Sequence, residues 1–524
     1  MIVGVWWWIA TPVHLARAPI DPSAKLECVS YAPFRGNQSP MDQTLVVGPE
    51  QIAEDFAQLA QVSKCVRTYS VDQGLERAPE VAAKAGLKVM LGIWIGPDKQ
   101  KNANQIATAV QLTKDYPGVI SAVIVGNEVL LRGEMTTTDL VNTIRYVKSQ
   151  VSVPATYADV WEFWLRNREI ESVTDFVTVH ILPFWEDFPV RARHAAAHVD
   201  AIRKRVAIAF PDKEVLIGET GWPSAGRMRE GALPSRTNQA RVVSEILDLA
   251  ARENFRVNLI EAYDQPWKRR FEGTVGGYWG LYDADHRTLK YPAGMPISNF
   301  PFWKWQMGIG LAFSLLVFAV AWRTAIRRPW SPRWTLWTSV AISATVGGTL
   351  LGLAIEKMFV ESLDLGAWIR WTFLCAAGIA SPLLASHALM RSQSLPTFSE
   401  LLSPAPLGRN WGWQTYLLGA TLLVTTLIAS ETALGFVFDP RYRDFPYGAL
   451  SMAVIPLVGL MVYNRPSKGV RPMAEAVFAG LLVLSVAYIA FNEGGANWQS
   501  LWTCGLYLLL GVTLWQARDG QSQE

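Results

Sequence analysis

The sequence predicts an α/β fold of the (β/α)8 TIM-barrel type, followed by an all-α domain with several transmembrane helices. Two observations support the barrel: short apolar runs alternate with amphipathic stretches through the first 300 residues, and these runs number eight. A third observation supports the membrane domain. Of the 93 Asp, Glu, Lys and Arg residues, only 26 lie in the last 224 positions, where long apolar stretches follow one another.

The N-terminal segment, residues 1–24, is predicted to be a signal peptide or an N-terminal membrane anchor. Ile2 to Leu15 is an apolar run, and Ala16-Arg17-Ala18 after it fits a small-x-small cleavage site. No basic residue precedes the run, so cleavage and retention as a short anchor both stay open. Either alternative places the following domain outside the cytoplasm.

Residues 25–300 carry the pattern of a barrel in which parallel strands are buried on both faces. Between the predicted strands lie helical stretches such as 52–62, 75–85 and 241–254. The strands are expected at 27–34, 64–70, 87–95, 119–127, 154–160, 176–182, 214–219 and 257–264. In this fold the active site lies at the carboxyl ends of the strands, so polar residues that end apolar runs are the candidates.

Residues 301–524 are predicted to form a membrane domain of about seven helices. The spans are expected at 305–322, 334–355, 367–389, 414–437, 447–463, 473–491 and 498–515, of which the fifth and the last are short. Basic residues favour the odd-numbered connections by nine to three, which predicts that those connections are cytoplasmic. The large N-terminal domain then lies on the extracytoplasmic face, which is the periplasm in a cell with two membranes.

A few ionisable residues fall inside the predicted spans, close to their ends. They are Arg370, Glu431 and Glu475, with His387 as a weaker case. Such residues either mark a functional path or extend to the membrane interface, and the second interpretation is favoured here.

Two glutamates end apolar runs in the same way, each after a glycine. Glu128 follows Val125-Gly126-Asn127 at the end of the fourth strand, and Glu219 follows Ile217-Gly218 at the end of the seventh. Two carboxyl groups at one barrel mouth are what glycoside cleavage needs: one protonates the leaving oxygen, and the other attacks the anomeric carbon or activates water. The alternative is two ordinary buried glutamates.

These motifs resemble glycoside hydrolase family 17, the β-1,3-glucanase family. The segments that carry the resemblance are VRTYS (66–70), VGNE (125–128), TYADVWEFW (156–164), VHILPF (179–184), IGETGWPS (217–224) and YWGLYDADHRTLK (278–290). The resemblance implies that Glu128 is the general acid/base and Glu219 the nucleophile of a retaining reaction, with their carboxyl groups about 5 to 5.5 Å apart. It also implies that Asn127 binds the sugar 2-hydroxyl, while Arg67 and Tyr69 position or tune the carboxylates.

Aromatic side chains near strand ends are candidates to hold the apolar faces of the sugar, although each of them could equally belong to the barrel core. Trp222, Tyr31 and Phe184 are the favoured ones. The substrate-binding set predicted in full is Asn127, Tyr31, Arg67, Tyr69, Asp159, Trp161, His180, Phe184, Trp222, Tyr263, Trp267 and Trp279. Glu261 and Asp264, in the eighth-strand region, either shape an acceptor subsite or satisfy buried backbone.

Cysteine and histidine content gives no sign of a metal site or a cofactor, and none is expected. Cys28 and Cys65 lie on adjacent predicted strands, where either a disulfide or two buried thiols could occur, and two thiols are the default expectation. A net charge of +3 without a concentrated basic segment excludes a dedicated nucleic-acid surface.

The whole layout resembles bacterial membrane-bound relatives of family 17 that are linked to periplasmic glucan synthesis, the rhizobial β-(1,6)-glucan synthases or β-glucanosyltransferases. The resemblance implies a membrane-bound enzyme that cleaves β-1,3-glucan and transfers the glycosyl unit to a glucan acceptor, forming β-1,6 linkages. Its expected partners are the glucan, the lipid bilayer and a β-glucan synthase. Two alternatives stay open: an endo- or exo-acting β-1,3-glucanase, and a non-catalytic glucan-binding subunit of a synthase or export complex.

Overall fold

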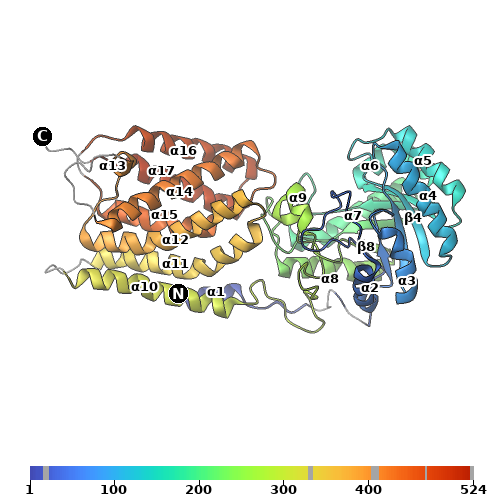
Figure 1. Cartoon of the computed structure of the whole chain (residues 1–524), viewed down its shortest axis with the longest axis horizontal. Helices are drawn as coiled ribbons and strands as arrows, with labels where there is room; N and C mark the ends of the chain where they lie inside the picture. The colour runs from blue at the N-terminus through green and yellow to red at the C-terminus, as the bar shows by residue number, and fades with distance from the viewer. Residues whose placement is uncertain (16–19, 21–22, 328–333, 403–411, 467–468, 520–524) are drawn as a thin grey trace. The chain divides into compact units, whose positions relative to one another are not determined.

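The computed structural model describes residues 1–15, 20, 23–327, 334–402, 412–466 and 469–519 (Figure 1). The chain divides into two compact units. The barrel unit contains Pro12–Gly226 and Gly231–Ile297, and the helical unit contains Met1–Thr11, Arg227–Glu230 and Ser298–Glu524. The Ala16-Arg17-Ala18 motif and the basic residues at 328, 333, 409 and 468 lie outside the described residues.

The barrel unit contains eight parallel strands that close into a barrel in chain order, which confirms the predicted fold. The strands are β1 (Cys28–Ser30), β2 (Cys65–Arg67), β3 (Lys88–Ile93), β4 (Ile120–Asn127), β5 (Ala155–Val160), β6 (Val177–His180), β7 (Val215–Thr220) and β8 (Val257–Leu259). β1 pairs with β8 through Cys28 opposite Asn258, and this pairing closes the barrel.

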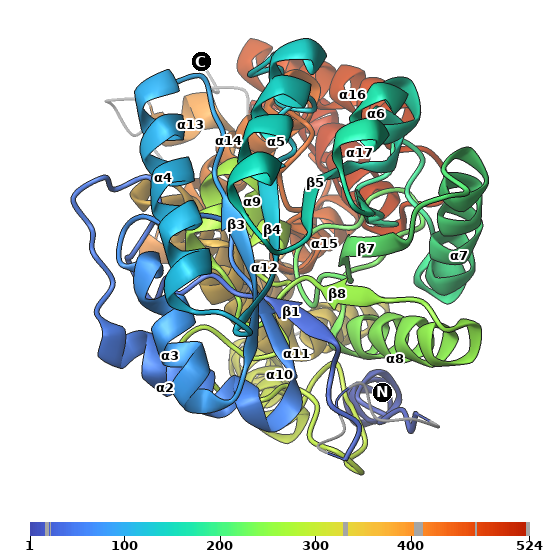
Figure 2. The ribbon, with the colours of Figure 1, turned by 90° about the vertical axis from the view of Figure 1, so that its right-hand side faces the viewer.

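Helices follow the strands and cover the outside of the barrel (Figure 2). They are α2 (Pro49–Val62), η1 (Leu75–Arg77), α3 (Ala78–Ala85), α4 (Lys99–Asp115), α5 (Thr137–Gln150), α6 (Trp161–Arg166), η2 (Arg168–Val173), α7 (Ala192–Ala209), α8 (Arg236–Glu253), η3 (Pro266–Lys268) and α9 (Arg269–Gly276). Side-chain caps begin several of them: Asp98 accepts hydrogen bonds from Gln100 N and Lys101 N at the start of α4, and Ser235 accepts one from Asn238 N at the start of α8.

Alternate strand residues belong to two separate apolar clusters, as the pleat of a strand requires. Val89 and Leu91 of β3 belong to the large cluster that includes the helices, whereas Met90 between them belongs to a smaller cluster. The smaller cluster contains Cys28, Cys65, Met90, Ala122, Ile124, Ala158, Phe176 and Leu216, one or two residues from each of several strands or their edges. Such layers fill the interior of a TIM barrel.

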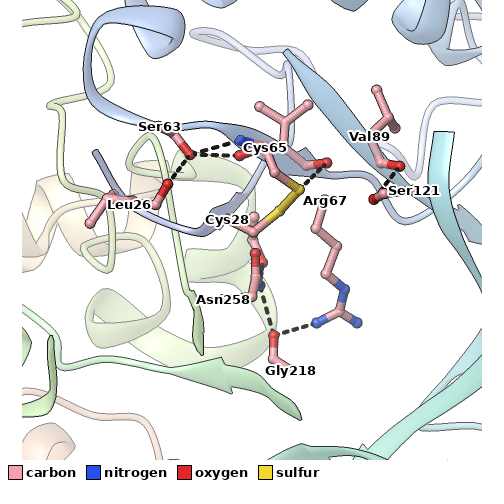
Figure 3. Close-up of a disulfide and its surroundings, with 11 residues drawn as sticks. Leu26, Cys28, Ser63, Cys65, Arg67, Val89, Ser121, Gly218 and Asn258 are labelled. Carbon is pink, nitrogen blue, oxygen red and sulfur yellow. Dashed lines mark hydrogen bonds between the residues drawn. A yellow bond between two sulfur atoms is a disulfide. The ribbon is translucent and has the colours of Figure 1, made fainter. Parts of the chain in front are cut away.

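Cys28 and Cys65 form a disulfide between β1 and β2, so the expectation of two buried thiols is wrong (Figure 3). Strand pairing explains the bond, because Val29 lies opposite Val66 and brings the preceding residues of both strands to a Cα separation of 4.4 Å.

The helical unit contains seven long helices after residue 300, close to the predicted spans, and a short N-terminal helix, α1 (Ile2–Ile9). The long helices are α10 (Trp303–Ala325), α11 (Trp334–Glu361), α12 (Leu365–Arg391), α14 (Trp413–Phe438), α15 (Tyr447–Tyr463), α16 (Met473–Glu493) and α17 (Trp498–Gln516), with the short α13 (Phe398–Leu402) between α12 and α14. Among the described residues, five of these helices are long and apolar enough to cross a membrane: α10, α11, α12, α14 and α16. The other two, α15 and α17, are the spans that the sequence marks as short.

The ionisable residues inside the spans are paired or buried within the helical unit. Glu431 accepts hydrogen bonds from Arg370 at 3.2 Å and from Arg443 at 3.3 Å, and His387 Nδ1 lies 3.0 Å from Thr324 Oγ1. Glu475 is fully buried and accepts a hydrogen bond from Phe398 N, so extension to the interface is the wrong interpretation for this residue.

The segment Arg227–Glu230 belongs to the helical unit by its contacts. Arg227 Nη2 lies 2.5 Å from both carboxylate oxygens of Glu493, and Met228 N donates to Gln499 Oε1 at 2.9 Å. Glu493 and Arg227 are both buried, so their charges compensate each other inside the unit.

Candidate active site

Glu128 stands at the carboxyl end of β4, where the backbone turns sharply. Gly126 has φ of +87° and Glu128 has φ of +53°. A Cβ at Gly126 would come within 2.7 Å of Val129 Cγ2, so both the left-handed backbone and the close contact require glycine there. Glu128 N donates to Ala158 O at 2.8 Å, which fixes the turn against β5.

Glu219 lies inside β7, next to a close approach between β6 and β7. A Cβ at Gly218 would come within 2.4 Å of Thr178 Cγ2 and 3.2 Å of His180 Cδ2. Glycine at 218 therefore leaves the space that the His180 ring fills. The register of the two strands places His180 directly opposite Glu219.

The His180 imidazole lies between the two glutamates and contacts both. Its Nδ1 is 2.8 Å from Glu128 Oε1, and its Nε2 is 3.6 Å from Glu219 Oε1. A carboxylate oxygen of Glu128 lies within 4.8 Å of one from Glu219. An approach of this size between carboxylate oxygens suits the retaining type of glycoside cleavage, in which the carboxyl groups are about 5 to 5.5 Å apart.

Arg67 and Tyr69, at the end of β2, surround the Glu219 carboxylate. Tyr69 OH donates to Glu219 Oε1 at 2.7 Å, and Arg67 Nη1 donates to the same oxygen at 3.2 Å. The Arg67 guanidinium also donates to Gly218 O at 2.7 Å (Figure 3) and to Asn127 Oδ1 at 2.5 Å. One buried guanidinium therefore connects the end of β2 to β4 and β7.

Contacts with Arg67 also determine which nitrogen of His180 carries the proton. Arg67 Nη1 lies 3.4 Å from His180 Nε2, and a guanidinium can only donate hydrogen bonds. Nε2 is then the acceptor, and Nδ1–H donates to Glu128. Burial raises the pKa of Glu128, but the hydrogen bond from His180 and the charges of Arg132 and Arg67 outweigh it and hold that pKa below its usual range.

Asp159, at the end of β5, is a third buried carboxyl group next to the pair. Burial raises its pKa to about 6, and the nearby charge of Glu128 adds to the rise. The Tyr157 hydroxyl and Val160 N donate to its two oxygens, and both hydrogen bonds oppose the rise. Asp159 therefore contacts backbone and tyrosine rather than an open sugar site.

The eighth-strand region supplies two buried ion pairs. Lys268 Nζ lies 2.9 Å from both oxygens of Glu261, and Lys290 Nζ lies 2.7 Å from Asp264 Oδ1. Burial raises the pKa of Glu261 to about 7 and that of Asp264 to about 6, although the paired lysines oppose both shifts. Asp264 also accepts from Gly280 N at 2.8 Å, so it satisfies buried backbone, one of the two roles that the sequence allows.

Glu128, His180 and Glu219 also lie close enough together to hold a cation. The Arg67 guanidinium, however, already contacts Glu219 and His180 at 3.2 and 3.4 Å. A metal ion would have to sit beside this fixed positive charge, so the arrangement fits acid–base chemistry better than metal ligation.

The predicted aromatic residues occupy two different environments. Tyr31, Phe184, Trp222, Tyr263 and Trp279 are buried, whereas Trp161 and Trp267 are partly exposed. Tyr31 OH donates to Asp55 Oδ2 at 3.0 Å and its ring packs against Phe56 of α2, so this residue belongs to the barrel wall rather than to an open platform. Tyr263 OH similarly donates to Gln58 Oε1 at 2.8 Å.

Phe184, Trp222 and Trp279 form one aromatic cluster with Trp185, which the sequence does not single out. Phe184 packs edge-on against Trp222, Trp185 and Trp279, with ring centroids 5.1 to 6.2 Å apart. Trp185 stacks on Trp279 with an interplanar angle of 13°. Phe184 and Trp222 are buried, so their rings do not present a face to a sugar. They support the ring of Trp185, which is partly exposed.

Three contributors to the site carry no signal in the sequence. Asn258 Nδ2 donates to Gly218 O at 2.7 Å (Figure 3) and to Ser30 Oγ at 2.8 Å, while Tyr69 OH contacts the same Ser30 oxygen at 2.9 Å. Arg132 contacts Asn127 O and places its guanidinium 4.3 Å from the Trp94 ring centroid. Strand pairing brings Ser30, Gly218 and Asn258 together, although they are distant in the sequence.

Comparison with known proteins gives matches to the barrel. The model of the BtgE/BtgC glycoside hydrolase domain matches residues 28–280. A glucan 1,3-beta-glucosidase of Arthroderma benhamiae is 31% identical over 266 residues, which cover 47% of this chain and 85% of that protein. A probable family 17 glucosidase of Saccharomyces cerevisiae is 25% identical over 263 residues, 49% of this chain and 64% of that protein.

A crystal structure of a glycoside hydrolase family 17 beta-1,3-glucanosyltransferase from Rhizomucor miehei is 24% identical, with a TM-score of 0.45, and the match covers 51% of this chain and 95% of that one. The family-model match and the identity to the Arthroderma protein agree with the motifs around Glu128 and Glu219. The chain therefore belongs to glycoside hydrolase family 17, and its barrel is a BtgE/BtgC glycoside hydrolase domain.

Proposed function

We propose that this protein is a membrane-bound retaining enzyme that cleaves β-1,3-glucan and transfers the released glycosyl unit to a glucan acceptor. The observation that carries the proposal is the pair of carboxylates whose oxygens lie within 4.8 Å of each other, with His180 between them. Glu219 is the nucleophile, because Arg67 and Tyr69 both donate to one of its oxygens and hold the carboxylate in place. Glu128, whose side chain is 23% exposed, is the general acid/base.

In the first step a Glu219 oxygen attacks the anomeric carbon as the glycosidic bond breaks. Glu128 gives its proton to the leaving oxygen, and a covalent glycosyl-enzyme ester remains. In the second step Glu128 takes a proton from an acceptor hydroxyl, whose oxygen attacks the anomeric carbon and releases the Glu219 carboxylate. The acceptor is a sugar hydroxyl in transfer and water in hydrolysis.

Side chains around the pair keep the reacting groups in position. Asn127, held by Arg67 through its Oδ1, keeps its amide NH2 for the sugar 2-hydroxyl. His180 Nδ1 donates to Glu128 and orients it between the two steps. The partly exposed Trp161, Trp185 and Trp267 are the aromatic rings best placed by exposure to contact sugar.

Product analysis tests the activity and its type. The purified full chain in detergent is incubated with laminaripentaose, and we expect products longer than the substrate, with β-1,6 branches visible by linkage analysis as the bacterial resemblance implies. Products that are only shorter would identify a hydrolase instead. Glu219→Gln is expected to abolish both transfer and hydrolysis, and retained activity would overturn the assignment of the nucleophile.

The alternative of a non-catalytic glucan-binding subunit is disfavoured by the intact set of Glu128, Glu219, Asn127 and Arg67, in which Arg67 contacts both Asn127 and Glu219. Such a subunit would have no need for a buried Arg67–Glu219 pair. A Glu128→Gln/Glu219→Gln double variant that supports normal glucan structure in the cell would favour this alternative.

We further propose that the helical unit spans the membrane and that the barrel lies on the extracytoplasmic face. Five long apolar helices support insertion, and the distribution of basic residues supports the orientation. The Cys28–Cys65 disulfide supports it independently, because stable disulfides form in oxidising compartments. Alkylation of denatured cells with a maleimide–polyethylene glycol is expected to label Cys375 and Cys504 only, and labelling of all four cysteines would contradict this placement.

A further inference from the structure

A groove lies between α4 and α5, on the outside of the barrel and away from the catalytic residues. The two helices run next to each other in both views of the fold (Figures 1 and 2). The groove has a volume of about 1030 Å³, at the upper end of the range for ligand sites. It extends along α4 from Lys99 to Lys114, which is about 22 Å at the helical rise per residue.

The groove is lined by small or apolar side chains, by uncharged polar side chains and by a few charged ones, around one exposed aromatic ring. The ring is that of Tyr146, which is 58% exposed. The polar side chains include Gln111, Asn142, Thr143 and Gln150. Ala103 and Ala107 of α4 face the same groove, and their small side chains leave it open.

Amides and hydroxyls both donate and accept hydrogen bonds, as sugar hydroxyls do. A tyrosine ring can cover the apolar face of a pyranose and donate from its hydroxyl at the same time. The formal charges that line the groove sum to zero, because the two lysines, Lys99 and Lys114, are matched by Glu134 and Asp139. A nucleic acid would need an excess of positive charge, so this lining suits a neutral polysaccharide better.

One end of the groove reaches the loops that carry the active site. Gly96 and Pro97 follow β3, and Gly133 and Glu134 belong to the loop after β4 that begins with Glu128. Arg132 connects the two places, because its guanidinium contacts Asn127 O on one side and donates to Glu134 Oε2 at 2.6 Å on the other. A chain that leaves the mouth over Arg132 and Trp94 would enter the groove directly.

We propose that the groove between α4 and α5 is a second glucan-binding site, which holds a distant part of the same β-glucan chain whose reacting bond lies between Glu128 and Glu219. This inference rests on the proposed function and adds to it that the enzyme prefers long glucan chains as substrates. The site increases the affinity for polymer and leaves the chemistry on short substrates unchanged.

Steady-state kinetics of the full chain on laminarin and on laminaripentaose test the groove. Tyr146→Ala removes the ring, and Ala107→Trp fills the groove from the exposed face of α4. We expect both variants to raise the apparent KM for laminarin about fivefold with kcat unchanged, and to leave kcat/KM for laminaripentaose within about twofold of wild type. Ile208→Ala, which removes an exposed apolar side chain from α7, is the matched control and is expected to change neither value.

Failure of the groove and failure of the proposed function give different results. If the wild type acts on neither substrate, the proposed function is wrong and the groove inference falls with it. If the wild type acts on both and the two variants match it on laminarin, only the groove inference is overturned. Equal losses on both substrates would also overturn it, because the groove would then affect the reacting site itself.

Discussion

His180 Nδ1 lies 2.8 Å from Glu128 Oε1, and the ring is completely buried. The same ring faces Arg67 and Glu219 through Nε2, and Asp159 lies close enough to affect the charges of the group. The proton on Nδ1 therefore connects a residue from β6 to the acid/base on β4. We therefore expect that replacing His180 changes the pKa of Glu128 more than any other property of the site.

His180→Gln is expected to move the alkaline limb of the pH profile of kcat/KM upward by about one to two units, since the carboxylate of Glu128 loses a hydrogen bond of roughly 1.5 to 3 kcal/mol. The glutamine amide reaches the position of Nε2 rather than that of Nδ1. His180→Asn is the matched control, because its amide nitrogen can replace the Nδ1 donor and should keep the limb near the wild-type pH. Equal shifts in both variants would contradict the proposed donor.

Gly218→Ala is expected to lower kcat/KM about a hundredfold, because the new Cβ would push the His180 ring and Thr178 away from β7 and displace the hydrogen bond to Glu128. Adding Thr178→Ser removes the Cγ2 atom at 2.4 Å and should recover part of the loss. Activity on laminaripentaose measures both. Full activity of the single variant would show that the close approach of β6 and β7 does not position the histidine.

Asp159 makes the stability of the barrel depend on pH. Its pKa of about 6 in the folded chain is above the ordinary value of 3.8, so between pH 4 and 6 the folded state holds a proton that the unfolded chain has lost. Protonation of Asp159 therefore contributes less to the free energy of unfolding as pH rises through that window. The loss is at most about 3 kcal/mol, and the contribution is constant at higher pH.

Asp159→Asn is expected to reduce the fall in apparent Tm between pH 4.5 and 7, measured by circular dichroism of the full chain. A part of the fall should remain, because burial also raises the pKa values of Glu261 and Asp264. An unchanged fall would mean that Asp159 titrates near its ordinary pKa in the folded protein.

The Cys28–Cys65 disulfide closes a loop with a sequence separation of 37. Cys28→Ala/Cys65→Ala is expected to cost about 3 to 4 kcal/mol, or roughly 10 °C of apparent Tm, mainly because the unfolded chain gains freedom. Reduction with dithiothreitol should produce a similar loss in the wild type and none in the variant. Cys375→Ala, at a free buried thiol of the helical unit, is the control for which reduction should still lower the Tm.

Local sequence was enough to predict the eight strands, the helices between them and the long helices after residue 300. Each strand is a short apolar run buried on both faces, and each long helix is an apolar stretch of membrane length, so the signal for both is periodicity within the segment itself. The position of Glu128 and Glu219 at one end of the barrel was also predictable, because each ends such a run after a glycine and closed barrels bring strand ends to one face.

Only the tertiary structure decided which side chains contact the two glutamates and which aromatic rings stay accessible. Ser30, Arg67, Asn258 and His180 lie on four different strands, and their contacts depend on the register between strands, which no single segment encodes. Tyr31 and Trp222 lie just beyond the ends of β1 and β7 as the sequence predicts, yet their rings are buried in the packing of the barrel. The type and end of each element are fixed by local hydrophobic pattern, whereas burial, proton position and disulfide pairing depend on which segments meet in space.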